Sequence, residues 1–350
     1  MNMDESDFIL TEAEIASAQR ELGLVPTELG VKLPAEPTPA AVLDTVQSGE
    51  QSRFGWTIGT LSAPAKRVLF HYSVGNESLT RSIVAWDQSN SGEVATLALT
   101  GQLLRIATRT AEDLVALSST ILAAEAGVKE TPLSLGMSPA GLLTWLALVE
   151  QLQALELSAM LRHHTPMRIF NRADLEARLA GAIEEDFRWP LMFFTKVLPG
   201  DLPAAFTAAD VDRGIDELAA LELVEASGNG VWEMTPQGDW LVDEMLASVS
   251  KVGCGIAAYL SDGTIGYRTL MFVRTPRHLI LHLIEGDECV IATVSAGGLE
   301  RFLVDVFDSP EIEERPTRSA QSFCEQCGTA IHPDDLFCAN CGNPLTGGVS

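Results

Sequence analysis

Basic residues are scarce in this 350-residue chain. Its 23 Lys and Arg residues stand against 48 Asp and Glu residues, which leaves a formal net charge of -25. A field of that sign repels phosphate groups, so it disfavours a general nucleic-acid coat or a binder of anionic membranes. No apolar run approaches the roughly 18 residues that span a bilayer, and the acidic start MNMDESDF does not resemble a secretory signal. We therefore expect a soluble, acidic, cytoplasmic protein.

The common catalytic signatures are also missing. The sequence contains no phosphate-binding glycine loop, no nucleophile elbow and no HExxH motif. His163 and His164 are adjacent, so their side chains diverge, and we expect them at a solvated helix end. His278 and His282 would share a metal only on a helix, but the run after Pro276 favours a strand, on which they would be about 13 Å apart. We expect no enzyme, and we assign no catalytic or cofactor-binding residue.

Apolar residues, in contrast, make up 46% of the chain, and its length suggests two or three globular domains. A helix is predicted over 8–22, where Thr11 supplies a cap and Glu14 follows three residues later. The proline-rich segment 26–40 is a connector. Period-two runs then predict strands at 67–74, 81–87 and 94–99, followed by a helix over 110–122 that Thr110 caps.

The same order recurs near the end of the chain. Strands are predicted at 269–275, 278–285 and 289–295, and a helix at 298–307. The isolated Cys254 and Cys289 are expected to be small buried hydrophobes on strands. The fold class that we predict is α+β: two similar β-β-β-α units, related by duplication, surround a mostly helical middle region.

That middle region begins with residues 138–161, which are apolar almost all round and predict one buried helix or two short packed ones. A further helix is predicted over 174–185. Residues 187–247 then resemble a winged-helix domain, on three features: the passage ELAALELVE from helix to strand, a Gly-Asn-Gly turn at 228–230, and TPQG opening the last helix.

The resemblance implies that the helix before the wing could enter a DNA groove. The stretch 207–225, however, has Arg213 as its one basic residue against six acids. Phosphate contacts supply most nonspecific affinity for DNA, so we expect a protein-binding or purely structural module. The DNA-binding interpretation would be favoured again if the nearby cations lay together on one face instead of pairing with acids. These cations are Arg168, Arg172, Arg178, Arg188 and Lys196.

Four cysteines cluster at the C-terminal end, in two C-x2-C pairs that ten residues separate: Cys324, Cys327, Cys338 and Cys341. Gly328 and Gly342 follow the pairs, where each tight turn needs a residue tolerant of positive φ. Residues 323–345 resemble the short zinc-ribbon family, which implies that the four thiolates hold one structural Zn²⁺. A rubredoxin-like iron site and disulfides are the alternatives. His332 is expected on the surface, because four thiolates saturate the ion.

Five parts of the chain follow from these patterns: an N-terminal α/β unit with a leading helix (1–130), a helical and winged-helix-like region (131–250), a second β-β-β-α unit (251–307), a linker (308–322) and a zinc ribbon (323–350). The order of elements over 8–307 resembles the cytosolic substrate chaperones of type VII secretion. We expect a non-catalytic, chaperone-like adaptor that binds a protein partner. The alternative is a winged-helix transcriptional regulator whose α/β units sense a ligand.

Overall fold

The structure is a computed structural model. It describes residues 7–32, 42–75, 78–87, 92–100, 103–124, 127–129, 131–181, 189–198, 207–285, 288–308, 322–323 and 330–331.

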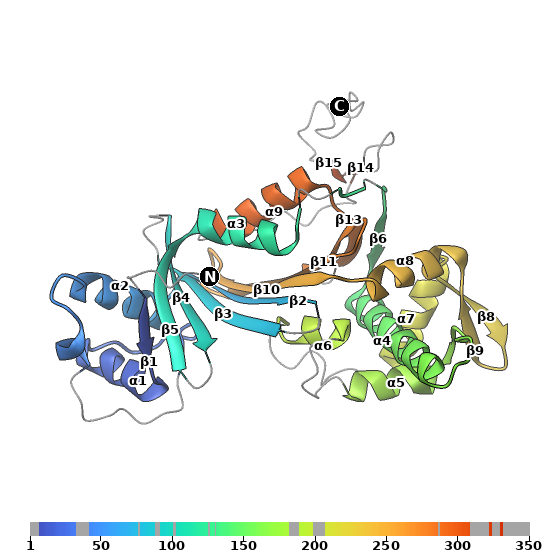
Figure 1. The fold of residues 1–350 in the computed structure, drawn as a ribbon, viewed down its shortest axis with the longest axis horizontal. Helices are drawn as coiled ribbons and strands as arrows, with labels where there is room; N and C mark the ends of the chain where they lie inside the picture. The colour runs from blue at the N-terminus through green and yellow to red at the C-terminus, as the bar shows by residue number, and fades with distance from the viewer. Residues whose placement is uncertain are drawn as a thin grey trace.

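The protein has a mixed α/β architecture that is built around one large antiparallel sheet (Figure 1). The strands are β1 (Phe8–Leu10), β2 (Lys66–Val74), β3 (Ser78–Trp86), β4 (Glu93–Thr100), β5 (Leu103–Thr110), β6 (Ser134–Met137), β7 (Ile169–Asn171), β8 (Val224–Gly228), β9 (Val231–Met234), β10 (Ser250–Tyr259), β11 (Ile265–Arg274), β12 (Leu279–Glu285), β13 (Glu288–Thr293), β14 (Ser322–Phe323) and β15 (Ala330–Ile331). The α-helices are α1 (Glu12–Glu21), α2 (Gln51–Ser62), α3 (Ala111–Ile121), α4 (Pro139–Leu161), α5 (Arg172–Gly181), α6 (Pro190–Thr195), α7 (Ala208–Ala220), α8 (Pro236–Leu246) and α9 (Ala296–Asp308), and a 3-10 turn covers Leu43–Thr45.

The sheet has ten strands in the order β1-β5-β4-β3-β2-β10-β11-β12-β13-β6, and every neighbouring pair is antiparallel. Strands β2 and β10 meet at its centre, with Phe70 opposite Cys254. The two predicted units therefore share one continuous sheet. Each unit has four strands before its helix, not three: β2–β5 precede α3, and β10–β13 precede α9.

Strands β5 and β10, which complete the two sets of four, escaped the prediction for different physical reasons. The sequence of β5 is LLRIATRT. Leu104 and Ile106 are buried, and the polar Arg105 lies between them, but the buried pair is too short to give a clear period-two pattern. β10 reads SKVGCGIAAY, and its glycines and alanines have low strand propensity. Gly255 is required there because a Cβ atom would lie 2.0 Å from the Val197 carbonyl oxygen, where the chain leaving α6 crosses the sheet.

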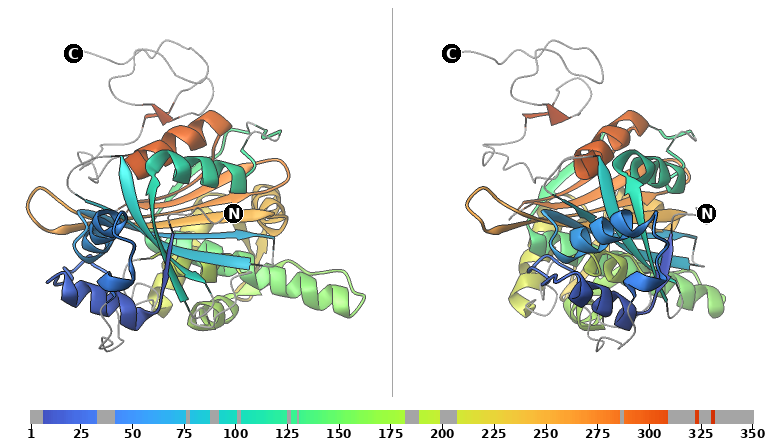
Figure 2. Two further views of the ribbon diagram at one scale, coloured as in Figure 1. Left: turned by 60° about the vertical axis from the view of Figure 1, so that its left-hand side comes forward. Right: turned by 90° about the vertical axis from the view of Figure 1, so that its left-hand side faces the viewer.

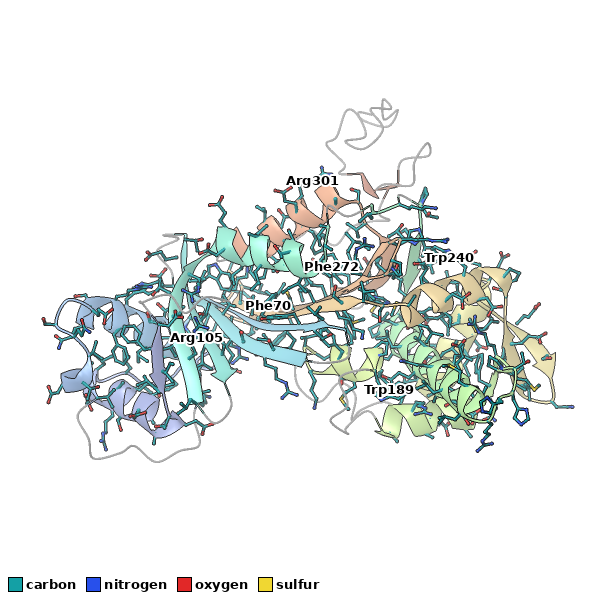
Figure 3. All side chains as sticks on the ribbon, in the orientation of Figure 1. Phe70, Arg105, Trp189, Trp240, Phe272 and Arg301 are labelled. Atoms are coloured by element: carbon teal, nitrogen blue, oxygen red, sulfur yellow. The ribbon has the colours of Figure 1, made fainter. Side chains whose placement is uncertain are left out.

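Helices α3 and α9 pack side by side on one face of the sheet (Figures 1 and 2). Phe70 and Phe272 lie beneath them (Figure 3), where Phe70 contacts Phe307 edge-on at 5.8 Å and Phe272 contacts Phe302 at 5.8 Å. Strands from both halves of the sheet thus share one buried core with α3 and α9.

Helices α1 and α2 cover the opposite face at the N-terminal end of the sheet. Thr11 and Glu14 form the predicted capping box of α1, although the helix starts at Glu12 and residues 8–10 form a strand. Residues 51–62 form helix α2, although the sequence analysis predicted no helix there and took the chain from residue 54 onward as period-two. Its apolar Phe54, Ile58 and Leu61 recur at helical spacing and are buried against the sheet.

The same opposite face is covered at the C-terminal end by α4 and α6, whose side chains form the largest buried cluster together with α7 and α8. Helix α4 is one continuous helix, which Ser138 caps at the Gly141 amide. The elements α7, β8, β9 and α8 follow the order that the sequence predicts for 206–245, and Gly228, Asn229 and Gly230 all have positive φ in the turn. Strand β7 joins β8 and β9 in a separate three-stranded sheet.

Candidate protein-binding site

The four cysteines predicted to bind zinc, and His332, lie outside the described residues. Ser322 and Phe323, which precede the first C-x2-C pair, pair antiparallel with Ile331 and Ala330, which follow it. Within the ranges that the structure does describe, no group of three or more His, Cys, Asp or Glu residues could hold a metal ion. Cys254 and Cys289 are buried on β10 and β13, as predicted, and burial raises the pKa of the Cys254 thiol.

His282 lies on β12 and His278 directly precedes that strand, so neither residue is on a helix, as the sequence predicts. His282 lies on β12 between Met271 and Ile291 of the neighbouring strands. Burial lowers its pKa to about 3, so the imidazole is neutral. Its side chain is fully buried in the core.

His278 has a different environment, which the sequence did not reveal. It precedes β12, and its Nδ1 lies 3.0 Å from Oε2 of Glu244 on α8 while its Nε2 lies 3.0 Å from the Thr131 hydroxyl. The Trp240 ring contacts it edge-on at 5.4 Å (Figure 3). Thr275 donates a further hydrogen bond to Glu244. These residues come from separate segments, so the network ties α8 and the segment before β6 to the turn between β11 and β12.

The basic residues of the middle region do not form a free cationic face. Arg168 is held by Glu156, Asp239 and Asp243, and these bonds raise its pKa although burial opposes them. Arg172 pairs with Glu176 and Asp212. Arg178 donates to Gln151 at 2.9 Å and lies over the Trp189 ring at 5.8 Å, and Arg213 pairs with Asp210. Arg188 lies outside the described residues. Of the five cations that DNA binding would need, Arg168 and Arg172 are therefore engaged by neighbouring acids, and Arg178 is engaged by an amide and an aromatic ring.

A concentration of exposed apolar side chains lies instead at the C-terminal end of α4. Thirteen large apolar side chains are exposed among the described residues, and five of them fall within 157–169. We name these five the α4 tip: Leu157, Met160, Leu161, Met167 and Ile169. The exposed fractions of Leu161, Met160 and Met167 are 83%, 68% and 66%.

The geometry of the helix end brings these side chains together. Leu157, Met160 and Leu161 share one face of α4, because residues three and four apart are neighbours on a helix. The chain then turns back, and the Arg168 guanidinium contacts Glu156, which places Met167 and Ile169 beside the same turn. The N-terminal two-thirds of α4 is buried, so the tip projects from a rigid support. His163 and His164 follow it and are exposed, as predicted.

No helix in the described part of the chain is long and apolar enough to cross a bilayer. α4, the most apolar, carries Glu150 and Glu156 within its length.

Comparisons with known proteins do not place the chain in a family. No family matches the sequence, and no curated protein does. Among solved structures, the type VII secretion chaperone EspG5 of Mycobacterium tuberculosis, in complex with a PE25-PPE41 dimer, is similar at a TM-score of 0.43 and 11% identity, over 85% of this chain and 94% of that one. An RNA-binding light-oxygen-voltage receptor aligns at a TM-score of 0.09 and 12% identity, over 86% and 95%. Neither alignment is close enough to assign a function.

Proposed function

We propose that this protein is a non-catalytic, chaperone-like adaptor that binds another protein through the α4 tip. The observation that carries the proposal is the exposure of five large apolar side chains at one end of a single helix. Contiguous apolar patches on a soluble domain mark sites of interaction. Burying one such side chain contributes roughly 1.5–3 kcal/mol, so a partner that covers several of them gains substantial binding free energy.

The charges of the middle region favour this function over DNA binding. Ion pairs with acids of the same region hold Arg168, Arg172 and Arg213, and the turn at 228–230 carries no basic residue. We propose that α7, β8, β9 and α8 form a winged-helix module that supports the tip, since Ile215 and Leu218 of α7 and Leu241 of α8 belong to the cluster that buries α4.

We also propose that the C-terminal segment is a zinc ribbon that holds one structural Zn²⁺ through Cys324, Cys327, Cys338 and Cys341. The spacing and the two following glycines support it, as does the pairing of β14 with β15 on either side of the first cysteine pair. Such a ribbon would be a second, smaller module of the adaptor, because four thiolates leave the ion no open position for catalysis.

The test of the adaptor function compares the proteins captured from the native host by the tagged full chain, after nuclease treatment, with those captured by two variants. Leu161→Asp places a charge in the tip. Val304→Asp places the same charge on α9, at another exposed apolar position, and is the matched control. We expect a specific partner that the wild type and Val304→Asp retain and that Leu161→Asp loses. Identical capture by all three chains would contradict a role for the tip.

A further inference from the structure

The four strands at the centre of the sheet contain no acidic residue. Strands β3, β2, β10 and β11 are consecutive in the sheet, and none of them includes an Asp or a Glu. The whole chain, in contrast, has 48 acidic residues against 23 basic ones. The same four strands contain these basic residues: Lys66, Arg67, Arg81, Lys251, Arg268 and Arg274. The centre of the sheet is therefore a basic region of a strongly acidic protein.

Two of these cations lie on the face of the sheet opposite α3 and α9, next to polar side chains of β2. Side chains alternate between the faces along each strand, and residues directly opposite each other on neighbouring strands share a face. Phe70 of β2 belongs to the core beneath α3 and α9, so His71 and Ser73 point to the other face. Arg81 is opposite His71, and Lys251 is opposite Ser73. An imidazole, a hydroxyl and two cations are thus neighbours on one face of the sheet.

A third cation comes from the chain that leaves α6. Gly253 is the β10 partner of His71, and a Cβ atom at Gly253 would lie 3.2 Å from Cγ1 of Val197. Lys196 directly precedes Val197 and is partly exposed, as is Arg81. Burial lowers the pKa of His71 to about 4, and the positive charges of Arg81 and Lys196 also lower it. Both cations therefore lie close to the imidazole, which is neutral at pH 7.

Two polar groups beside these cations have no hydrogen-bond partner within the part of the chain that the structure describes: Nδ1 of His71 and Oγ of Ser73. The two residues are only 7% and 5% exposed. Buried polar groups in native proteins are almost always hydrogen-bonded, and an exception calls for an explanation such as a bound ion. The hydroxyl and the neutral imidazole each carry one proton, so both groups can donate to an anion.

We propose that this part of the sheet binds the phosphate group of a small molecule. Three cations and two neutral donors supply the contacts, and we name them the anion site: Arg81, Lys196, Lys251, His71 and Ser73. The proposal does not depend on the α4 tip, because none of these residues belongs to α4 or to the segment that follows it.

The chemistry of the anion site favours a phosphate group over a carboxylate. A phosphate group has close to two negative charges at pH 7 and three strong acceptor oxygens, so it can use several cations and both neutral donors at once. The planar guanidinium fork of arginine matches the geometry of phosphate, and lysine adds a point charge. The net charge of -25 opposes binding only weakly, because screening at physiological salt confines charge interactions to about 8 Å.

The experiment measures the binding of inorganic phosphate, glycerol 3-phosphate and acetate to the full-length chain by isothermal titration calorimetry at constant ionic strength. We expect saturable binding of one phosphate per chain, much weaker binding of acetate, and a melting temperature that rises with phosphate concentration. Tighter binding of glycerol 3-phosphate than of inorganic phosphate would support the proposal and identify an ester as the source of the group.

A matched pair of variants tests the charge. Lys196→Gln removes one positive charge at a partly exposed position, and it should weaken phosphate binding at least about tenfold, which is the effect of one lost charge-assisted hydrogen bond. Arg301→Gln removes the same charge from α9, on the other face of the sheet (Figure 3), and should leave the affinity unchanged. Circular dichroism checks that each variant is folded.

Ser73→Ala separates binding from folding. Because this hydroxyl has no partner among the described residues, its removal should not lower the unfolding midpoint of the phosphate-free protein, but it should weaken phosphate binding several-fold. A lower midpoint together with unchanged phosphate affinity would mean that the hydroxyl serves the fold and would remove Ser73 from the anion site.

Three further results would overturn the proposal. Phosphate binding that does not saturate at millimolar concentrations would show that no such site exists. An equal loss of affinity in Lys196→Gln and Arg301→Gln would show that phosphate responds to the overall charge of the protein. Acetate binding as tight as that of phosphate would show that the cluster selects a carboxylate instead.

Discussion

Glu244 and His278 meet across the junction between α8 and the start of β12, with Oε2 of the carboxylate 3.0 Å from Nδ1 of the imidazole. Both side chains are largely buried, at 11% and 4% exposure. The imidazole is also hydrogen-bonded to Thr131, which precedes β6. A hydroxyl, an imidazole and a carboxylate therefore connect three segments that are far apart in sequence, and they add polar contacts to the apolar cluster in which α8 packs with residues of the sheet.

Replacing Glu244 with Gln should weaken this junction. The amide keeps the shape of the side chain but replaces the charged carboxylate, which accepts hydrogen bonds from Thr275 and His278, by a neutral group. We therefore expect the free energy of unfolding at pH 7 to fall by about 1–3 kcal/mol. Urea unfolding measures the change. Glu300→Gln on α9 is the control, because Glu300 is exposed and the same loss of charge there should have little effect.

The effect of Glu244→Gln should also depend on pH. Burial raises the pKa of Glu244, but hydrogen bonds from Thr275 and His278 lower it by more, so the pKa lies below its ordinary value. A carboxyl group whose pKa is lower in the folded protein than in the unfolded chain stabilises the fold at pH values above its unfolded pKa of about 4.3. That stabilisation is lost as the pH falls through the folded pKa. The wild type and the variant should thus converge in stability at acidic pH. A difference that is constant from pH 7 to pH 3 would contradict this account.

Gly255→Ala should displace the chain that leaves α6. The added methyl group would lie 2.0 Å from the Val197 carbonyl oxygen, a backbone atom that cannot swing aside, so we expect a loss of roughly 1–3 kcal/mol. Gly136→Ala on the edge strand β6 is the matched control, because no atom lies within 4 Å of its Cβ position and its stability should be close to that of the wild type. Equal unfolding midpoints for the two variants would show that α6 is not packed on the sheet in this way.

Gly255 also illustrates why only part of the fold could be predicted from the sequence. Segments with strong local signals were predicted well: Thr11 and Glu14 cap the start of α1, and the Gly-Asn-Gly turn joins β8 to β9. β10 was missed because its glycines serve a contact with Val197, which is distant in sequence. Local propensity cannot register a requirement that a distant segment imposes.

The candidate site shows the same division. A solvated helix end at His163 and His164 follows from their adjacency in sequence. That Met167 and Ile169 return to the same helix end depends on the contact of Arg168 with Glu156, and exposure of an apolar residue cannot be read from its type. The partnership of Thr131, Glu244 and His278 likewise requires knowledge of which segments are neighbours in space.

His163→Gly should stabilise the protein. Glycine adopts a φ of 55° without the clash of a Cβ atom, so the free energy of unfolding should rise by up to about 1 kcal/mol. His164→Gly is the comparison, since its φ is not positive, and there glycine only adds freedom to the unfolded chain and should destabilise by several tenths of a kcal/mol. Thermal unfolding of the two variants should shift in opposite directions. A parallel loss of stability would mean that the His163 side chain makes contacts that outweigh the backbone strain.

Zinc content tests the C-terminal cluster. If four thiolates hold one ion, the purified chain should contain about one zinc per molecule. Cys338→Ser should lose most of this zinc while the main body unfolds at the same urea concentration as the wild type, because a ribbon of this size depends on its metal to fold and the body does not. His332→Ala should keep its zinc, since four thiolates complete the tetrahedral coordination without an imidazole. Loss of the metal in His332→Ala with retention in Cys338→Ser would replace the four-cysteine site by a different set of ligands.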